Sequence, residues 1–177
     1  MNKIKAESSL RQVVFDAVII DGDTILHSSV HWPSEGTVND FVSGIERYIE
    51  GFLNLSDVNV IFDRYFERSI KSDTRNARIG NFRRSHNLSL MMELPPKDLC
   101  LKSTKTKENL IEIISTSLLE RFTSKRMQNR LLITSKSTCP EESHLGIRIK
   151  RRDLVTNYEE ADFIIPQQVN NLLEEGK

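Results

Sequence analysis

Cysteine is scarce in this chain, which has only two among its 177 residues, Cys100 and Cys139. The two stand apart with no CxxC pair, which excludes a zinc site built from cysteine pairs and argues against a disulfide framework. The four histidines have no metal-ligand spacing either. Such cysteine usage is typical of a reducing compartment, so we expect an intracellular protein, nuclear or cytoplasmic.

Long apolar segments are missing as well. No stretch approaches the roughly 18 apolar residues of a membrane span, and the first residues lack the apolar core of a signal peptide. We therefore expect no membrane partner. An excess of one charge is also missing, because 25 basic side chains face 25 acidic ones. Only local segregation of charge can therefore indicate a partner. The length suits a single domain with a substantial core.

Short apolar runs recur along the chain and predict strands. The first run covers 13–20, but Asp16 would be awkward in a strand buried on both faces, which favours a start after it. The run at 58–62 ends abruptly in Asp63. Further strands are expected at 130–134 and, as a small edge strand, around Ile147 and Ile149.

Helical periods alternate with these runs. The sequence predicts a helix over 38–53 with Thr37 as its N-cap, and a second helix over 105–122. A capping-box pattern at Thr156–Glu159 opens a last helix, and the segment between 84 and 101 has no clear period. Alternating strands and helices predict an α/β domain with a mainly parallel sheet of at least three strands.

Basic residues are concentrated after the second strand. Between Arg64 and Arg84 the chain has seven Lys or Arg residues and two acids. A helix would align Lys71, Arg75 and Arg78 along one side. A carboxylate with a row of cations behind it would suit a phosphodiester. From spacing alone, an ordinary core strand followed by an exposed basic helix is an equal alternative.

Acidic residues are expected to meet at one edge of the sheet. Asp21 and Asp63 follow two strands, and Glu160 and Asp162 lie at the start of the last helix. Parallel strands end at the same edge, where open α/β sheets bind ligands. We expect no internal cation near these acids. Because clustered carboxylates repel one another, they predict a bound Mg²⁺ or Mn²⁺. Two such ions can activate water and stabilise a leaving oxygen.

The string Val60-Ile-Phe-Asp-Arg-Tyr-x-x-x-Ser-Ile-Lys-x-x-Thr-Arg-x-x-Arg78 resembles the flap-endonuclease-like nucleases of the PIN superfamily. It is most similar to poorly characterised PIN-like proteins of animals, many of which look like products of mobile elements. Ile19-Ile-Asp-Gly-Asp-Thr-Ile-Leu-His27 resembles the first motif of the family, and Glu159-Glu-Ala-Asp162 resembles its third.

The resemblance implies a three-layer PIN-like, Rossmann-like domain that binds nucleic acid, DNA or RNA, and cleaves phosphodiesters with Mg²⁺ or Mn²⁺. It implies that Lys71 and Arg78 are the catalytic cations. Metal ligands would be Asp21, Asp63, Glu160 and Asp162. Nucleic-acid contacts would come from Arg64, Arg68, Arg75, Arg83 and Arg84.

Two departures from the family pattern qualify this expectation. Family members continue past the matching helix into a further strand with an Asp-x-Asp motif, whereas this chain ends at Glu174-Glu175-Gly176-Lys177. We therefore expect residues 1–177 to form one PIN-like domain without the C-terminal strand: a truncated copy, a splice form or a folded remnant. Pro166 would also cost the last helix about 3 kcal/mol or a kink.

Two other functions stay open. The first is a catalytically inactive remnant that serves as a nucleic-acid or protein interaction module. The second, minor one is a phosphatase of the haloacid-dehalogenase type, suggested by Asp21-Gly22-Asp23-Thr24 after a strand. The later acidic signature of those phosphatases is absent. Because family ligands are missing, we expect one weak metal site, better filled by Mn²⁺, with little or no cleavage. The oligomeric state is left open.

Overall fold

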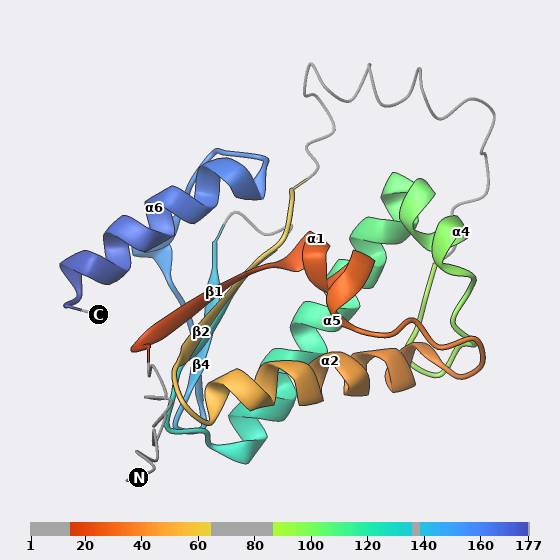
Figure 1. The fold of residues 1–177 in the computed structure, drawn as a ribbon, viewed down its shortest axis with the longest axis horizontal. Helices are drawn as coiled ribbons and strands as arrows, with labels where there is room; N and C mark the ends of the chain where they lie inside the picture. Colours follow the sequence, from red (N-terminus) through yellow and green to blue (C-terminus); the bar gives the residue numbers. More distant parts are fainter. Residues whose placement is uncertain (1–14, 65–86, 136–138, 177) are drawn as a thin grey trace, which may run out of the picture.

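The computed structural model describes residues 15–64, 87–135 and 139–176 (Figure 1). Five strands form one sheet in the order β1-β2-β3-β4-β5. β1, β2 and β3 are parallel, and β4 and β5 add an antiparallel hairpin. The predicted α/β class and the parallel pairing of the first two strands are confirmed. The strands are β1 (Ala17–Asp21), β2 (Asp57–Ile61), β3 (Leu131–Thr134), β4 (Glu141–His144) and β5 (Ile147–Lys150).

Helices cover both faces of the sheet and give three layers (Figure 1). Val58 and Val60 of β2 belong to the main core, which also holds the apolar faces of α2 and α5. Ile61, on the opposite face, packs with Ile164 of α6. The main helices are α2 (Val38–Leu53), α5 (Thr104–Lys125) and α6 (Ala161–Glu174), and the short ones are α1 (Gly22–Thr24), η1 (Ile25–Ser29), α4 (Lys97–Lys102) and η2 (Arg152–Leu154).

The start of α2 follows the sequence prediction. Thr37 is the N-cap, and Asp40 completes a reciprocal capping box in which each side chain bonds the backbone N–H of the other. Phe41, Ile45 and Ile49 then lie on the buried face. Local capping and apolar period agree here, so the sequence alone was sufficient.

Three local features differ from the sequence prediction. The segment 84–101 was expected to be irregular, yet it contains most of α4. β4 was not predicted, because its sequence Glu-Glu-Ser-His has no apolar residue. Its inward side chains are polar and paired: Glu142 with Arg151, and Ser143 with the hydroxyl of Thr123. A pattern search for apolar strands cannot find such an element.

The third concerns the start of α6. The hydroxyl of Thr156 accepts from the N–H of Tyr158 and not from the helix, which begins at Ala161 with Glu160 as N-cap. The first N–H of the helix, that of Ala161, instead donates to Asp63 beyond β2, at 2.8 Å. A long-range cap has replaced the expected local one. The helix continues through Pro166 to Glu174. No helix among the described residues is long and apolar enough to cross a membrane.

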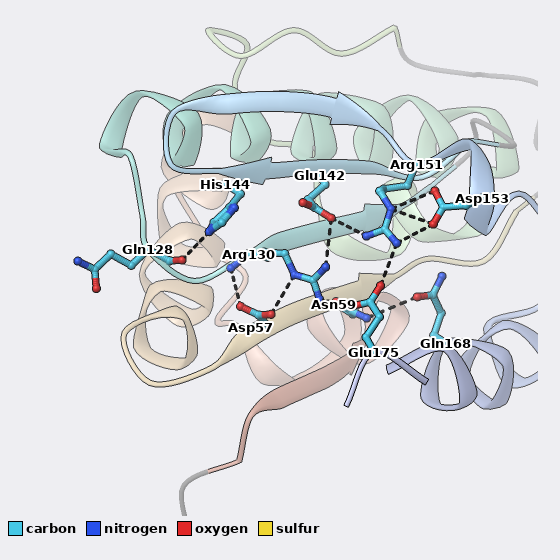
Figure 2. A network of polar contacts seen from close by, with 10 residues as sticks. All are labelled: Asp57, Asn59, Gln128, Arg130, Glu142, His144, Arg151, Asp153, Gln168 and Glu175. Atoms are coloured by element: carbon cyan, nitrogen blue, oxygen red, sulfur yellow. Dashed lines mark hydrogen bonds and ion pairs between the residues drawn. The ribbon is translucent and has the colours of Figure 1, made fainter. Parts of the chain in front are cut away.

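A group of charged side chains joins the amino ends of β2 and β3 to β4, η2 and α6 (Figure 2). Arg130 contacts Asp57 at 2.9 Å and Glu175 at 2.7 Å. Arg151 contacts Glu142 at 2.7 Å and Glu175 at 3.0 Å. These ion pairs tie the end of α6 to the sheet. We call them the ionic network, which consists of Asp57, Arg130, Glu142, Arg151, Asp153 and Glu175.

Candidate functional site

Two of the predicted acids lie at the same edge of the sheet. β1 and β2 are parallel, with Asp21 in register with Ile61, so Asp63 follows two residues beyond that register position. Strands that end at one edge bring their following residues together, and Asp63 is close enough to Asp21 and Asp23 for their charges to act on it. We call Asp21, Asp23 and Asp63 the acidic rim.

The side chain of Asp21 shapes the turn after β1. Its two carboxylate oxygens accept from the N–H of Asp23 at 2.9 Å and from the hydroxyl of Thr24 at 3.1 Å. Gly22 between them is packed against Phe62, and a Cβ at Gly22 would lie 2.2 Å from that ring. The Asp-Gly-Asp-Thr sequence therefore has a structural reason as well as a possible chemical one.

Asp63 carries the clearest sign of electrostatic tension in the rim. Burial raises the pKa of its carboxyl group, and repulsion by Asp23 and Asp21 adds to that rise. The hydrogen bond from Ala161 and the charge of Lys107 act in the opposite direction but do not cancel it. The ionised form of Asp63 is therefore less favourable than that of an ordinary aspartate, as expected for crowded carboxylates.

Lys107 of α5 is the residue that the sequence analysis missed. Its Nζ lies 2.6 Å from Oδ2 of Asp23, and the side chain is largely buried. Asp23 is not one of the four predicted ligands, but the charge of Lys107 also acts on Asp63, which is one of them. Lys107 stands three and four residues before Leu110 and Ile111, on the apolar face of the helix. A lysine at an inward helical position is the signal that would have found it.

The two remaining predicted acids, Glu160 and Asp162, lie at the start of α6. The backbone carbonyl of Glu160 accepts from Phe163 and Ile164, and Asp162 lies exposed in the first turn. Within 15–64, 87–135 and 139–176, no three His, Cys, Asp or Glu side chains are grouped so that they could hold a metal ion. The oxygens have the chemistry that Mg²⁺ or Mn²⁺ prefers, but their arrangement within the described residues is not a formed metal centre. No hydrolytic step follows from it.

One oxygen of the rim lacks a partner. Oδ1 of Asp23 is buried and has no hydrogen bond, while Oδ2 pairs with Lys107. An unsatisfied buried acceptor is costly and is uncommon away from functional sites. Together with the raised pKa of Asp63, it shows that the carboxylates of the rim are not fully compensated by their surroundings.

The basic residues fall into two groups. Arg64 is buried with 1% of its surface exposed, and its Nη1 donates to the carbonyl of Thr156 at 2.6 Å. Burial also lowers its pKa. It therefore does not present the phosphate contact predicted for it, because its guanidinium holds the segment before α6. The other predicted cations lie outside the described residues: Arg68, Lys71, Arg75, Arg78, Arg83 and Arg84.

Comparisons with known proteins add no assignment. No protein-family model matches this chain, and neither a curated protein nor a solved structure shows a significant similarity to it. Any functional conclusion therefore comes from its own residues.

Proposed function

We propose that this protein is a nucleic-acid-binding domain of the PIN-like, flap-endonuclease-like type. The observation that carries the proposal is the acidic rim, with Asp21 and Asp63 at the carboxyl ends of neighbouring parallel strands. Open α/β sheets bind their ligands at this edge. The basic stretch from Lys71 to Arg84 begins eight residues after Asp63 in the sequence and would supply the phosphate contacts.

Two contacts favour binding without cleavage. Lys107 already pairs with Asp23, and Asp63 already accepts from the first N–H of α6. A divalent ion would have to compete with both. The rim thus has carboxylates of the nuclease kind, but they are partly used to hold the fold together. We infer a protein that engages the backbone of DNA or RNA mainly through positive charge.

Metal-assisted phosphodiester cleavage is the second candidate, with Lys71 and Arg78 as its catalytic cations. The raised pKa of Asp63 favours it, because repulsion within the rim is what Mg²⁺ or Mn²⁺ would relieve. Asp21 and Asp63, with Glu160 and Asp162, would then be the ligands. A weak site that Mn²⁺ fills better than Mg²⁺ is the form we propose.

Binding is tested by fluorescence anisotropy with labelled single-stranded DNA, single-stranded RNA and duplex DNA at low salt. We expect an affinity that falls steeply with salt, since each neutralised phosphate releases a counterion. The double variant Arg75→Ala, Arg78→Ala should reduce the slope of log affinity against log salt concentration by the amount expected for about two phosphate contacts. The matched control, Lys102→Ala with Lys105→Ala, removes two exposed cations elsewhere and should change nothing.

Two results would overturn the binding proposal: no binding to any of the three probes, or an equal loss in both double variants. Cleavage is followed on the same oligonucleotides with Mg²⁺ or Mn²⁺. Cleavage that disappears in Asp63→Asn while binding persists would favour the second candidate over the first.

A further inference from the structure

One edge of the sheet is open. In the described part of the chain, β1 pairs only with β2, which leaves its other side without a strand. The N–H of Asp57 donates to the carbonyl of Asp16 at 3.0 Å. Because backbone groups alternate in direction along a parallel strand, Ala17 and Ile19 direct theirs away from β2. Such unpaired groups are a template for one more strand.

An apolar groove runs beside this open edge, between β1 and α6. Its volume is about 410 Å³. Phe15 and Leu173, at its border, are 61% and 65% exposed. Apolar side chains that line one continuous groove are more informative than scattered ones, because they mark a surface that a partner can cover. The lining residues are Phe15, Asp16, Ala17, Ile19, Val169, Leu172 and Leu173.

Acidic residues stand at both ends of β1 and α6, the two elements that form the groove. α6 runs antiparallel to β1, so the end of the helix lies beside the start of the strand (Figure 1). Asp16 lines the groove there, and Glu174 follows Leu173. At the other end, Asp21 closes β1 and Asp162 lies in the first turn of α6. A ligand with an apolar centre and positive ends would match this distribution of charge.

We propose that the groove binds an extended peptide segment of a protein partner, with apolar residues at its centre and Lys or Arg on both sides. The segment adds a strand to β1 through main-chain hydrogen bonds and places alternate side chains under α6. A second copy of this chain fits less well. Antiparallel pairing of two β1 strands about a two-fold axis would bring the acids at the two strand ends together.

The probe is a labelled synthetic peptide, Lys-Val-Thr-Val-Thr-Val-Lys, whose binding is measured by fluorescence anisotropy. Two versions carry N-methyl groups, one at the valines and one at the threonines. Only one set of N–H groups can face β1, so one version should bind about tenfold more weakly or worse, as the loss of two or more hydrogen bonds implies. The other version should bind nearly as well as the parent peptide.

Protein variants test the same surface. Leu173→Lys places a positive charge in the groove, of the same sign as the lysines of the peptide, and should weaken binding by about tenfold. Met91→Lys is the matched control, since Met91 is exposed before α4 and does not line the groove. The proposal is overturned if both N-methylated peptides bind alike, or if the parent peptide does not bind at low salt. A dimer that Leu173→Lys dissociates, seen by sedimentation equilibrium, would assign the groove to a second copy and refute the peptide.

Discussion

The acidic rim and the ionic network use the same residue types with opposite results. In the network, four carboxylates surround two guanidinium groups, and hydrogen bonds to Arg130 and Arg151 lower the pKa of Glu175 despite its partial burial. Hydrogen bonds to Arg151 likewise lower the pKa of Asp153. In the rim, Lys107 pairs with Asp23 and its charge also acts on Asp63, yet the pKa of Asp63 is raised.

The difference separates what holds the fold from what a ligand can change. Charges that favour their ionised forms in the folded state add to stability at neutral pH, whereas crowded acids subtract from it. Crowding of like charges, as in the rim, is more frequent at functional sites. The two regions lie at opposite ends of the parallel strands, so the same sheet supports both. The predictions below test whether this contrast holds.

The largest effect is expected in the network. Arg130→Met removes a guanidinium group that pairs with Asp57, which is buried, and also with Glu142. Breaking a buried ion pair from one side leaves an uncompensated charge, so the free energy of unfolding should fall by about 3 kcal/mol in urea denaturation. Lys102→Met removes an exposed helical pair with Asp98 and is the control. If both variants lose equally little, the network does not stabilise the fold.

Lys107→Met tests the rim itself. It leaves Asp23 beside Asp63 without its cation, and we expect a loss of about 2 kcal/mol, reduced because Asp23 is partly exposed. Repulsion should rise, so Mn²⁺ should increase the melting temperature more in this variant than in the parent. Differential scanning fluorimetry with and without Mn²⁺ measures both effects. Lys105→Met, an exposed neighbour, should change neither, and an unchanged Mn²⁺ response in Lys107→Met would exclude Lys107 as the competing cation.

The sequence predicted the parts of this molecule in which local pattern and tertiary packing agree. The segment from Val58 to Phe62 is apolar except for Asn59, and it lies in or directly after a strand that is buried along its whole length. Thr37 and Asp40 cap α2 from within the same turn. The meeting of Asp21 and Asp63 at one edge also followed, because parallel strands and the residues after them leave no other arrangement.

The remainder depended on contacts between distant residues. β4 is held by polar partners outside the sheet, Arg151 after β5 and Thr123 of α5, and Lys107 reaches the rim across 84 positions of sequence. Likewise, Asp63 caps a helix that begins 98 residues later, a role that its position after a strand does not reveal. Arg64 looked like the first of seven phosphate-binding cations, yet its side chain turns inward to Thr156. Spacing assigns residues to elements but not to their partners.

Substitution of Asp63 distinguishes its charge from its hydrogen bond. Asparagine can still accept from the N–H of Ala161 but carries no charge, so Asp63→Asn should raise the unfolding free energy at pH 7 by up to about 1 kcal/mol. Asp63→Ala loses the cap and should be less stable than Asp63→Asn by about 1 kcal/mol. Thermal or urea denaturation of the three proteins provides the comparison.

The pH dependence of the stability difference between Asp63→Asn and its parent shows whether the charge of Asp63 is destabilising. The folded-state pKa of Asp63 is raised above its ordinary value of 3.8, so its penalty is present at neutral pH and disappears as the pH falls through the raised value and below 3.8. The advantage of Asp63→Asn should vanish over the same range. An Asp63→Asn protein that melts below the parent at pH 7 would mean that the charge of Asp63 is stabilising and that the rim is not in conflict.

The smallest expected effect concerns Glu175, whose side chain is 34% exposed where α6 meets the ionic network. Glu175→Gln weakens its pairs with Arg130 and Arg151, and because solvent screens them, the loss at pH 7 should be below about 1 kcal/mol. The pKa of Glu175 is lowered in the folded state, so its contribution is complete above the ordinary value of 4.5 and disappears as the pH falls through the lowered one. Urea denaturation of both proteins from neutral to acidic pH should therefore give unfolding free energies that converge in acid, because the parent loses the stabilisation from Glu175. The free energies of Asp63→Asn and its parent also converge in acid, but there the parent gains stability relative to the variant. If Glu175→Gln were instead more stable than its parent at pH 7 and lost that advantage on acidification, Glu175 would be a repelled carboxylate like Asp63, and the contrast between network and rim would fail at this residue.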